Sequence, residues 1–210
     1  MDIIKLPSRE YCEQLFIQYK VPHNIKIHCY KVNQIAVFLA KKLSEAGQDI
    51  DIDLVDRLSL LHDLMKAVAL KRLDKNPVFK SDPTDEEIVM RKQLKQKYLN
   101  KHETQITSSL VRKDYPAFAD SIEQEGNSAI FTSKKRLEEQ IVHYADWRVF
   151  VDDIIPLQQR IDDLFKRYNE KIMARGLEIW KKRVADELAV EKQIFNKLAI
   201  KPEDLKRILK

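Results

Sequence analysis

His62 and Asp63 stand side by side within the apolar segment Leu58–Lys66. Burying an imidazole and a carboxylate together costs several kcal/mol unless something compensates both groups, as a bound divalent cation would. Two more residues of the same kinds, His28 and Asp146, also lie in apolar stretches with helical periodicity. A lone histidine in such a place is more often a hydrogen-bonded core residue than a ligand. The four residues together indicate a metal site.

The chemistry of this donor set narrows the choice of metal. Two imidazoles and two carboxylates suit Mn²⁺, Fe²⁺, Co²⁺, Ni²⁺, Mg²⁺ or Zn²⁺ better than an all-sulfur structural site would. Such a set leaves coordination positions for water and substrate, so the site is able to support a reaction. The identity of the metal stays open at this point.

The order His, His-Asp, Asp along the chain resembles the HD-domain superfamily of metal-dependent phosphohydrolases. Three segments carry the resemblance over roughly residues 20–170, and they read VPHNIKIH from Val21, LLHDLMK from Leu60 and IVHYADWR from Ile141. The resemblance implies an all-α HD-domain helical bundle. It also implies four metal ligands, which in this chain are His28, His62, Asp63 and Asp146.

The same resemblance implies hydrolysis of a phosphoester or phosphoanhydride in a nucleotide-like substrate by a metal-activated water. Asp63 and Lys66 are then the catalytic pair, because residues three positions apart project from the same face of a helix. Lys66, His102 and Arg148 are expected to bind the substrate. Each has a plainer alternative: an exposed lysine at a helix end, a core histidine and a structural salt-bridge donor, respectively.

One position departs from the family pattern. Members that bind two metals carry another histidine shortly after the segment that corresponds to residues 118–125, and here that segment ends in Glu125. Glu125 is either an oxygen ligand or, more commonly for a glutamate, a solvent-exposed side chain. We therefore expect one divalent ion per chain.

The elements that must position these residues all have helical periodicity. Helices are expected after Pro22 up to Gly47, from Asp53 to Leu73, from the capping box at Thr84, through Leu99 and His102 to Leu110, and from Leu137 to Phe150, with a loop over 76–84. A long amphipathic pattern follows Pro156, and Pro202 begins a last short helix. The pattern predicts a metal-binding domain over 1–156 and a C-terminal helical extension over 157–210 that packs on it.

Composition sets further bounds. The chain has 210 residues, 44% of them hydrophobic and 34% charged, which is ordinary for a helix-rich soluble protein. Only three glycines argue against β-hairpins and against a Gly-rich phosphate loop. Cys12 and Cys29 are too few for a disulfide scaffold. No apolar stretch approaches ~18 residues and the N-terminus lacks the apolar core of a signal peptide, so we expect a cytoplasmic protein without membrane spans.

The net charge of +5 points to an alternative function. Residues 156–210 contain 14 basic and 9 acidic residues, and a basic tail can bind nucleic acid. Because its charges alternate in sign, a solvated helix face is the favoured interpretation. The alternative is a nonenzymatic, metal-stabilised helical module that binds RNA or a protein partner through this part. A helical bundle without a ligand is a third option, and either a monomer or a homodimer fits the sequence.

Overall fold

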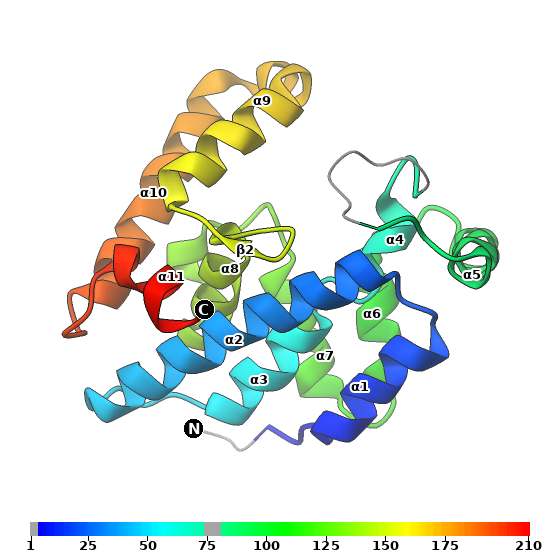
Figure 1. Cartoon of the computed structure of the whole chain (residues 1–210), viewed down its shortest axis with the longest axis horizontal. Helices are drawn as coiled ribbons and strands as arrows, with labels where there is room; N and C mark the ends of the chain where they lie inside the picture. Colours follow the sequence, from blue (N-terminus) through cyan, green and yellow to red (C-terminus); the bar gives the residue numbers. More distant parts are fainter. Residues whose placement is uncertain (1–3, 74–80) are drawn as a thin grey trace.

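Helix α2 (His23–Glu45) is the long helix around which the computed structural model is built (Figure 1). The structure describes residues 4–73 and 81–210, and the described part is mostly helical with almost no strand, which confirms the all-α fold class. The other α-helices are α1 (Arg9–Gln18), α3 (Ile52–Leu61), α4 (Lys66–Ala69), α5 (Asp85–Lys97), α6 (Glu103–Val111), α7 (Pro116–Glu125), α8 (Leu137–Trp147), α9 (Leu157–Arg175), α10 (Leu177–Phe195) and α11 (Leu205–Ile208). Most of the predicted loop over 76–84 lies outside the described residues. No described helix is both long and apolar enough to cross a membrane.

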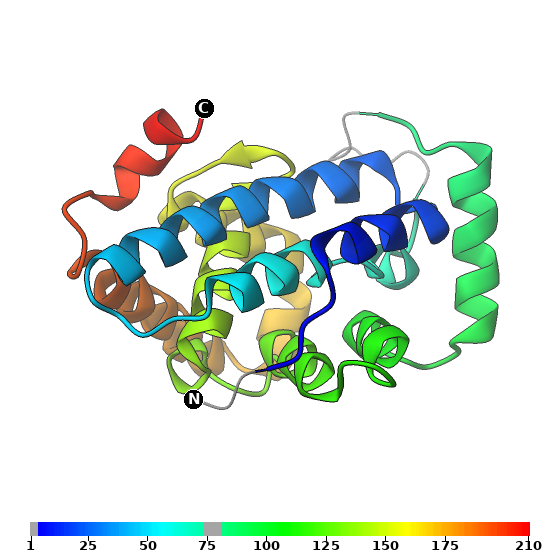
Figure 2. The ribbon, with the colours of Figure 1, turned by 90° about the horizontal axis from the view of Figure 1, so that it is seen from below.

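Helices α3 and α8 pack against α2, and Figure 2 shows α3 lying along it. Apolar residues of α2 spaced three or four apart are fully buried, among them Val32, Ile35 and Leu39. The helix begins after Pro22 and ends before Gly47, which has a φ of +82°, as the sequence predicts. This three-helix core holds the elements that carry His28, His62 and Asp146.

The predicted helix from Asp53 to Leu73 is wrong in one important respect. Helix α3 ends at Leu61, residues 62–65 form a turn, and only Lys66–Ala69 is helical again. The Leu64 N–H donates to Leu61 O at 3.2 Å and the Lys66 N–H to Asp63 O at 3.0 Å, so three-residue turns replace the helical ladder. Because no Gly or Pro marks the turn, periodicity alone extends the helix through it.

The predicted helix through Leu99 and His102 also begins too early. Leu99 is 72% exposed, and α6 starts at Glu103 with His102 as its N-cap residue. The His102 N–H donates to the Gln105 side chain at 3.1 Å, which satisfies a donor that a helix start leaves free. The capping box predicted at Thr84 is confirmed, with Thr84 and Glu87 bonded reciprocally at the start of α5.

A minimal β-hairpin contradicts the expectation drawn from the low glycine content. Strands β1 (Val149–Phe150) and β2 (Asp153–Ile154) pair in antiparallel fashion. The turn between them does not need glycine because Val151 itself adopts a φ of +61°. A β-branched residue in this region is strained, and such strain persists only where the surroundings hold it in place.

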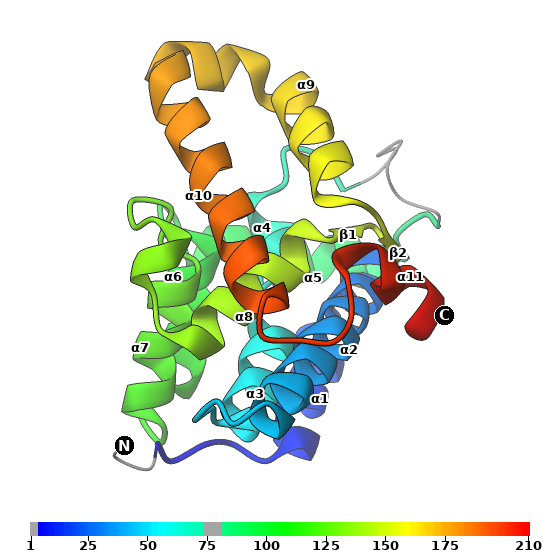
Figure 3. The ribbon, with the colours of Figure 1, turned by 90° about the vertical axis from the view of Figure 1, so that its left-hand side faces the viewer.

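The C-terminal extension is a helical hairpin, followed by the 3-10 turn η2 (Pro202–Asp204) and α11 (Figures 1 and 3). The long amphipathic pattern is interrupted at Gly176, whose φ of +106° lets α9 turn back into α10. Trp147 of α8 stacks on Trp180 of α10 with their ring centroids 6.3 Å apart. The predicted boundary at residue 156 falls between β2 and α9.

A buried polar cluster joins α10 to the bundle near η1 (Thr132–Lys134). His143 of α8 lies between two carboxylates, with Nδ1 at 3.4 Å from Glu125 Oε1 and Nε2 at 3.2 Å from Glu187 Oε1. Thr132 Oγ1 also donates to Glu187, at 2.5 Å. Burial alone would lower the pKa of His143, but its contacts with Glu125 and Glu187 outweigh burial and raise the pKa to about 9.

This cluster makes stability depend on pH. Because the pKa of folded His143 lies above the roughly 6.5 of an unfolded histidine, its charge stabilises the fold fully below pH ~6.5, and this contribution is lost as the pH rises through about 9. His143→Gln should therefore lower the free energy of unfolding by roughly 3 kcal/mol at pH 6. At pH 9.5 the free energies of unfolding of the variant and the wild type should differ less, because His143 is then mostly neutral in the wild type. Urea unfolding of both proteins at pH 6, 7.5 and 9.5 measures it, and a difference independent of pH would contradict the assignment.

Candidate metal centre

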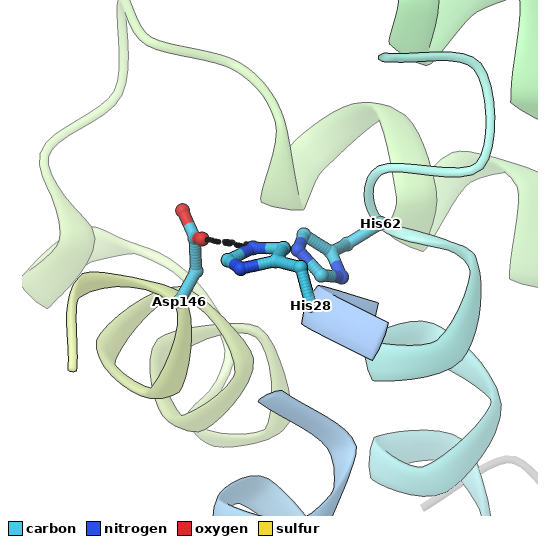
Figure 4. Close-up of side chains that lie close together, drawn as sticks. All are labelled: His28, His62 and Asp146. Carbon is cyan, nitrogen blue, oxygen red and sulfur yellow. Dashed lines mark hydrogen bonds and ion pairs between the residues drawn. The ribbon is translucent and has the colours of Figure 1, made fainter. Parts of the chain in front are cut away.

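Three side chains from three core helices converge at one point (Figure 4). His28 projects from α2 and Asp146 from α8, while His62 is the residue directly after α3. One ligand atom from each of the three lies within 4.8 Å of the others, and these residues could hold a metal ion. Residues 118 positions apart in sequence thus meet because α3 and α8 both pack on α2.

The ring of His62 is oriented for coordination. Its Nδ1 lies 2.7 Å from Ser59 O, and because a carbonyl oxygen only accepts hydrogen bonds, the proton is on Nδ1. In the neutral ring Nε2 therefore carries a lone pair. That atom is buried, lies 3.8 Å from Asp146 Oδ1 and has no hydrogen-bond partner in the described structure. An orphaned buried lone pair that faces a carboxylate fits a metal ligand.

The ring of His28 is held in the same way. Its Nδ1 donates to Val151 O at 3.1 Å, which leaves Nε2 facing Asp146 Oδ1 at 2.9 Å. Two acceptors at this distance repel each other unless a positive charge lies between them. A second proton on His28 supplies that charge, and a bound cation would supply it in the proton's place.

The electrostatics of the site follow from this pairing. Burial alone lowers the pKa of His28, but its hydrogen bond with Asp146 and the charge of that carboxylate outweigh burial and raise it. Burial would raise the pKa of the Asp146 carboxyl, yet the hydrogen bond from His28 and the charge of His28 hold it well below its usual range. The site therefore presents an ionised carboxylate to any cation.

Asp63, the fourth predicted ligand, stands apart from this group. Within the described residues, the group of converging ligand atoms comprises His28, His62 and Asp146 and does not include Asp63. The Asp63 carboxylate pairs instead with Lys66 Nζ at 3.3 Å. Burial opposes its ionisation, but the charge of Lys66 prevails and lowers the pKa of Asp63. Asp63 thus lies at the edge of the site as a carboxylate.

Lys66 and His102 lie beside the site and are linked through a residue that the sequence did not single out. Lys66 Nζ is 3.4 Å from Glu103 Oε1, and His102 Nε2 is 3.2 Å from Glu103 Oε2. The charges of Asp63 and Glu103 raise the pKa of Lys66, so it remains an ammonium group. His102 is exposed at the helix cap rather than buried in the core. Its neighbour Glu103 carries no spacing signal that could have identified it.

The side chain of Arg148, predicted to bind the substrate, is buried and has its partners within the protein. Its side chain is 3% exposed, and all three guanidinium nitrogens have partners within the protein. Nε donates to Ile155 O at 2.7 Å, Nη2 to Pro202 O at 3.1 Å, and Nη1 pairs with Glu191 at 3.2 Å and bonds Tyr144. These contacts tie the C-terminal extension to α8, as the structural alternative predicts, and the role of Arg148 in substrate binding stays a prediction.

The expectation that Glu125 is exposed is also wrong. Glu125 is 6% exposed and points to His143, three positions before Asp146 on α8. Its side chain belongs to the polar cluster at α10 and is not part of the converging ligand group. The single-metal prediction stays a prediction.

Comparison with family models, with curated proteins and with solved structures finds no match for this chain. The resemblance to HD-domain phosphohydrolases therefore remains an expectation carried by the residues quoted above. The all-α fold and the His28–His62–Asp146 cluster stand on the structure itself.

Wild-type protein equilibrated with Mn²⁺ or Co²⁺ and then desalted should retain about one ion per chain by elemental analysis. His62→Gln and Asp146→Asn should lose it, because each removes one of three converging donors. His102→Gln is the matched control and should keep the metal, since this exposed histidine lies outside the donor group.

Metal should also stabilise the wild-type fold. At a free metal concentration one hundred times the dissociation constant, the free energy of unfolding should rise by about 2.7 kcal/mol. Retention of stoichiometric metal by Asp146→Asn would contradict the assigned site, as would wild-type protein without metal under every loading condition.

Proposed function

We propose that this protein is a metal-dependent phosphohydrolase that acts on a nucleotide-like substrate. The observation that carries the proposal is the pair of imidazoles whose Nδ1 protons are engaged by backbone carbonyls, so that both Nε2 atoms face the Asp146 carboxylate. A histidine kept only for packing does not need this orientation. The order of the residues along the chain resembles that of HD-domain phosphohydrolases.

In this proposal His28, His62 and Asp146 hold the cation. A divalent ion supplies Lewis-acid stabilisation of a phosphoryl oxygen and lowers the pKa of water. The protein contributes the neutral donor atoms, the ionised carboxylate and the burial that strengthens both.

Asp63 and Lys66 act next to these donors. The ammonium of Lys66 keeps Asp63 ionised, so Asp63 is able to orient a water molecule and accept its proton. Lys66 offers its charge to a substrate phosphate while Asp63 and Glu103 position it from two sides. His102 pairs with the Glu103 carboxylate at 3.2 Å and is the further candidate for substrate contact.

The substrate class follows from the family resemblance and from the cationic side chains at the site. A phosphate group matches the ammonium of Lys66. Nothing in the described residues selects among nucleoside monophosphates, deoxynucleoside triphosphates, cyclic nucleotides and guanosine alarmones, so the test uses all four classes.

Phosphate release from this panel, with Mn²⁺, Mg²⁺, Co²⁺ or Ni²⁺ added, tests the proposal. At least one nucleotide should turn over, and Asp146→Asn should abolish turnover together with metal binding. Lys66→Ala should retain metal and lower kcat/KM roughly 100-fold, since it removes a charge that stabilises the transition state. Lys92→Ala, at an exposed lysine of α5, is the control and should behave as wild type. Full metal occupancy without turnover of any nucleotide would reject the proposed activity.

A second candidate function is binding of RNA by the far end of the α9–α10 hairpin. Residues 166–183 contain seven basic and two acidic residues, so this stretch accounts for the net charge of the whole chain, +5. Tyr168 is 43% exposed there, with Arg167 and Lys171 in cation–π contact with its ring. Basic groups around an exposed aromatic ring suit a single-stranded nucleic acid.

Fluorescence anisotropy with a labelled single-stranded RNA at two salt concentrations measures this binding. Reversal of charge at Lys171, Arg175 and Lys182 to Glu should weaken binding by at least about tenfold and reduce its salt dependence. The matched control lowers the net charge equally at exposed lysines elsewhere, Lys41, Lys92 and Lys113. Equal losses in both triple variants would mean that only net charge matters and would reject a specific surface.

A further inference from the structure

Arg160 lies in the first turn of α9. Its N–H donates to Pro156 O at 3.1 Å, so its position is fixed close to the point where α9 leaves β2. The same hairpin supplies the Val151 carbonyl that holds His28. The positive charge of Arg160 acts on both His28 and Asp146, which places this guanidinium within electrostatic reach of the converging donors.

The guanidinium of Arg160 is only partly satisfied by the protein. Its side chain is 13% exposed, and Nη1 pairs with Asp163 Oδ2 at 3.3 Å. Nε is buried and has no hydrogen-bond acceptor among the described residues. A buried donor without an acceptor costs about 1–3 kcal/mol, so this nitrogen is available to an acceptor that the free protein does not supply.

Asp163 does not explain Arg160 as a simple structural ion pair. Arg167, one turn further along α9, bonds both carboxylate oxygens of Asp163, with Nε at 3.0 and 2.9 Å. One carboxylate therefore serves two guanidinium groups, so the positive charge of the pair is only partly compensated by Asp163. Arg148 differs from Arg160, because all three of its guanidinium nitrogens have partners within the protein.

The charge balance of the site also indicates that a substrate phosphate needs a cationic group besides Lys66. Lys66 faces Asp63 at 3.3 Å and Glu103 at 3.4 Å, so its charge is largely compensated before any substrate binds. A phosphate group brings close to two negative charges and several acceptor oxygens. The planar guanidinium fork of an arginine matches such oxygens in geometry and charge.

We propose that Arg160 binds the phosphoryl oxygens of the substrate at the metal centre, so that α9 of the C-terminal extension completes the site. This inference deepens the proposed phosphohydrolase function and rests on it for the identity of the substrate. The ligand chemistry is that of a phosphate oxyanion. The extension is then a part of the site rather than an appendage that stabilises the bundle.

Calorimetric titration with inorganic phosphate in buffer that contains Mg²⁺ tests this role without any turnover. Arg160→Ala should weaken phosphate binding at least about tenfold, which corresponds to 1.4 kcal/mol. Arg160→Lys should recover part of the loss, because it restores the charge without the planar fork. The matched control is Arg167→Ala, which removes an arginine on the same helix that also pairs with Asp163 and should leave the affinity within about twofold of wild type.

Metal content and the melting temperature of each variant are measured alongside the titrations. If Arg160→Ala does not fold, Arg160→Lys and Arg160→Gln carry the test, because both keep the length of a polar side chain. Phosphate affinity in folded Arg160 variants equal to that of wild type would overturn the inference, and so would wild-type protein that binds no phosphate.

The same proteins assayed for phosphate release separate this inference from the proposed function. A wild type that hydrolyses no phosphoester but binds phosphate through Arg160 would reject the activity and retain the anion site. A wild type that hydrolyses a nucleotide, with both affinity and kcat/KM unchanged in Arg160→Ala, would retain the activity and reject the role of Arg160.

Discussion

The structure depends on one electrostatic constraint: two imidazole nitrogens and one carboxylate oxygen meet where positive charge is required. His28 and His62 each donate their Nδ1 proton to a backbone carbonyl, so their Nε2 atoms both face Asp146. In a partly buried place, donor atoms of this kind are stable together only around a proton or a cation. The packing of α3 and α8 on α2 brings the three side chains to this point.

The backbone is irregular where it serves this constraint. The turn over 62–65 begins directly after α3, and Ser59 O, three residues before His62, holds its imidazole. The β1–β2 turn keeps Val151 at a φ of +61°, and its carbonyl holds the other imidazole. Both departures from regular structure occur in a bundle that is otherwise well formed. Local strain that coincides with converging polar groups is typical of functional sites.

The C-terminal hairpin is joined to the bundle by buried polar contacts as well as by apolar packing. Arg148 pairs with Glu191, and His143 pairs with Glu187. These pairs join α8 to α10, and all four side chains would lose a partner if the hairpin detached from the bundle. Separating such a pair leaves a buried charge without its partner, which lowers the stability of the fold. Helix α10 in turn packs against α9, whose first turn contains Arg160, and the charge of Arg160 acts on His28 and Asp146. The extension and the site thus share one framework.

Helical periodicity in the sequence determined the all-α class, the limits of α2, and the placement of His28, His62 and Asp146 on apolar faces, because periodicity depends only on near neighbours. The same periodicity wrongly predicted that the helix carrying His62 continues through residues 62–65, since no Gly or Pro marks the turn there. Tertiary structure decided which distant groups meet: Arg148 forms a buried structural network, Arg160 lies near the donors, and Glu125 pairs with His143. Long side chains reach several ångströms, so their partners depend on how helices far apart in sequence pack, which no local pattern encodes.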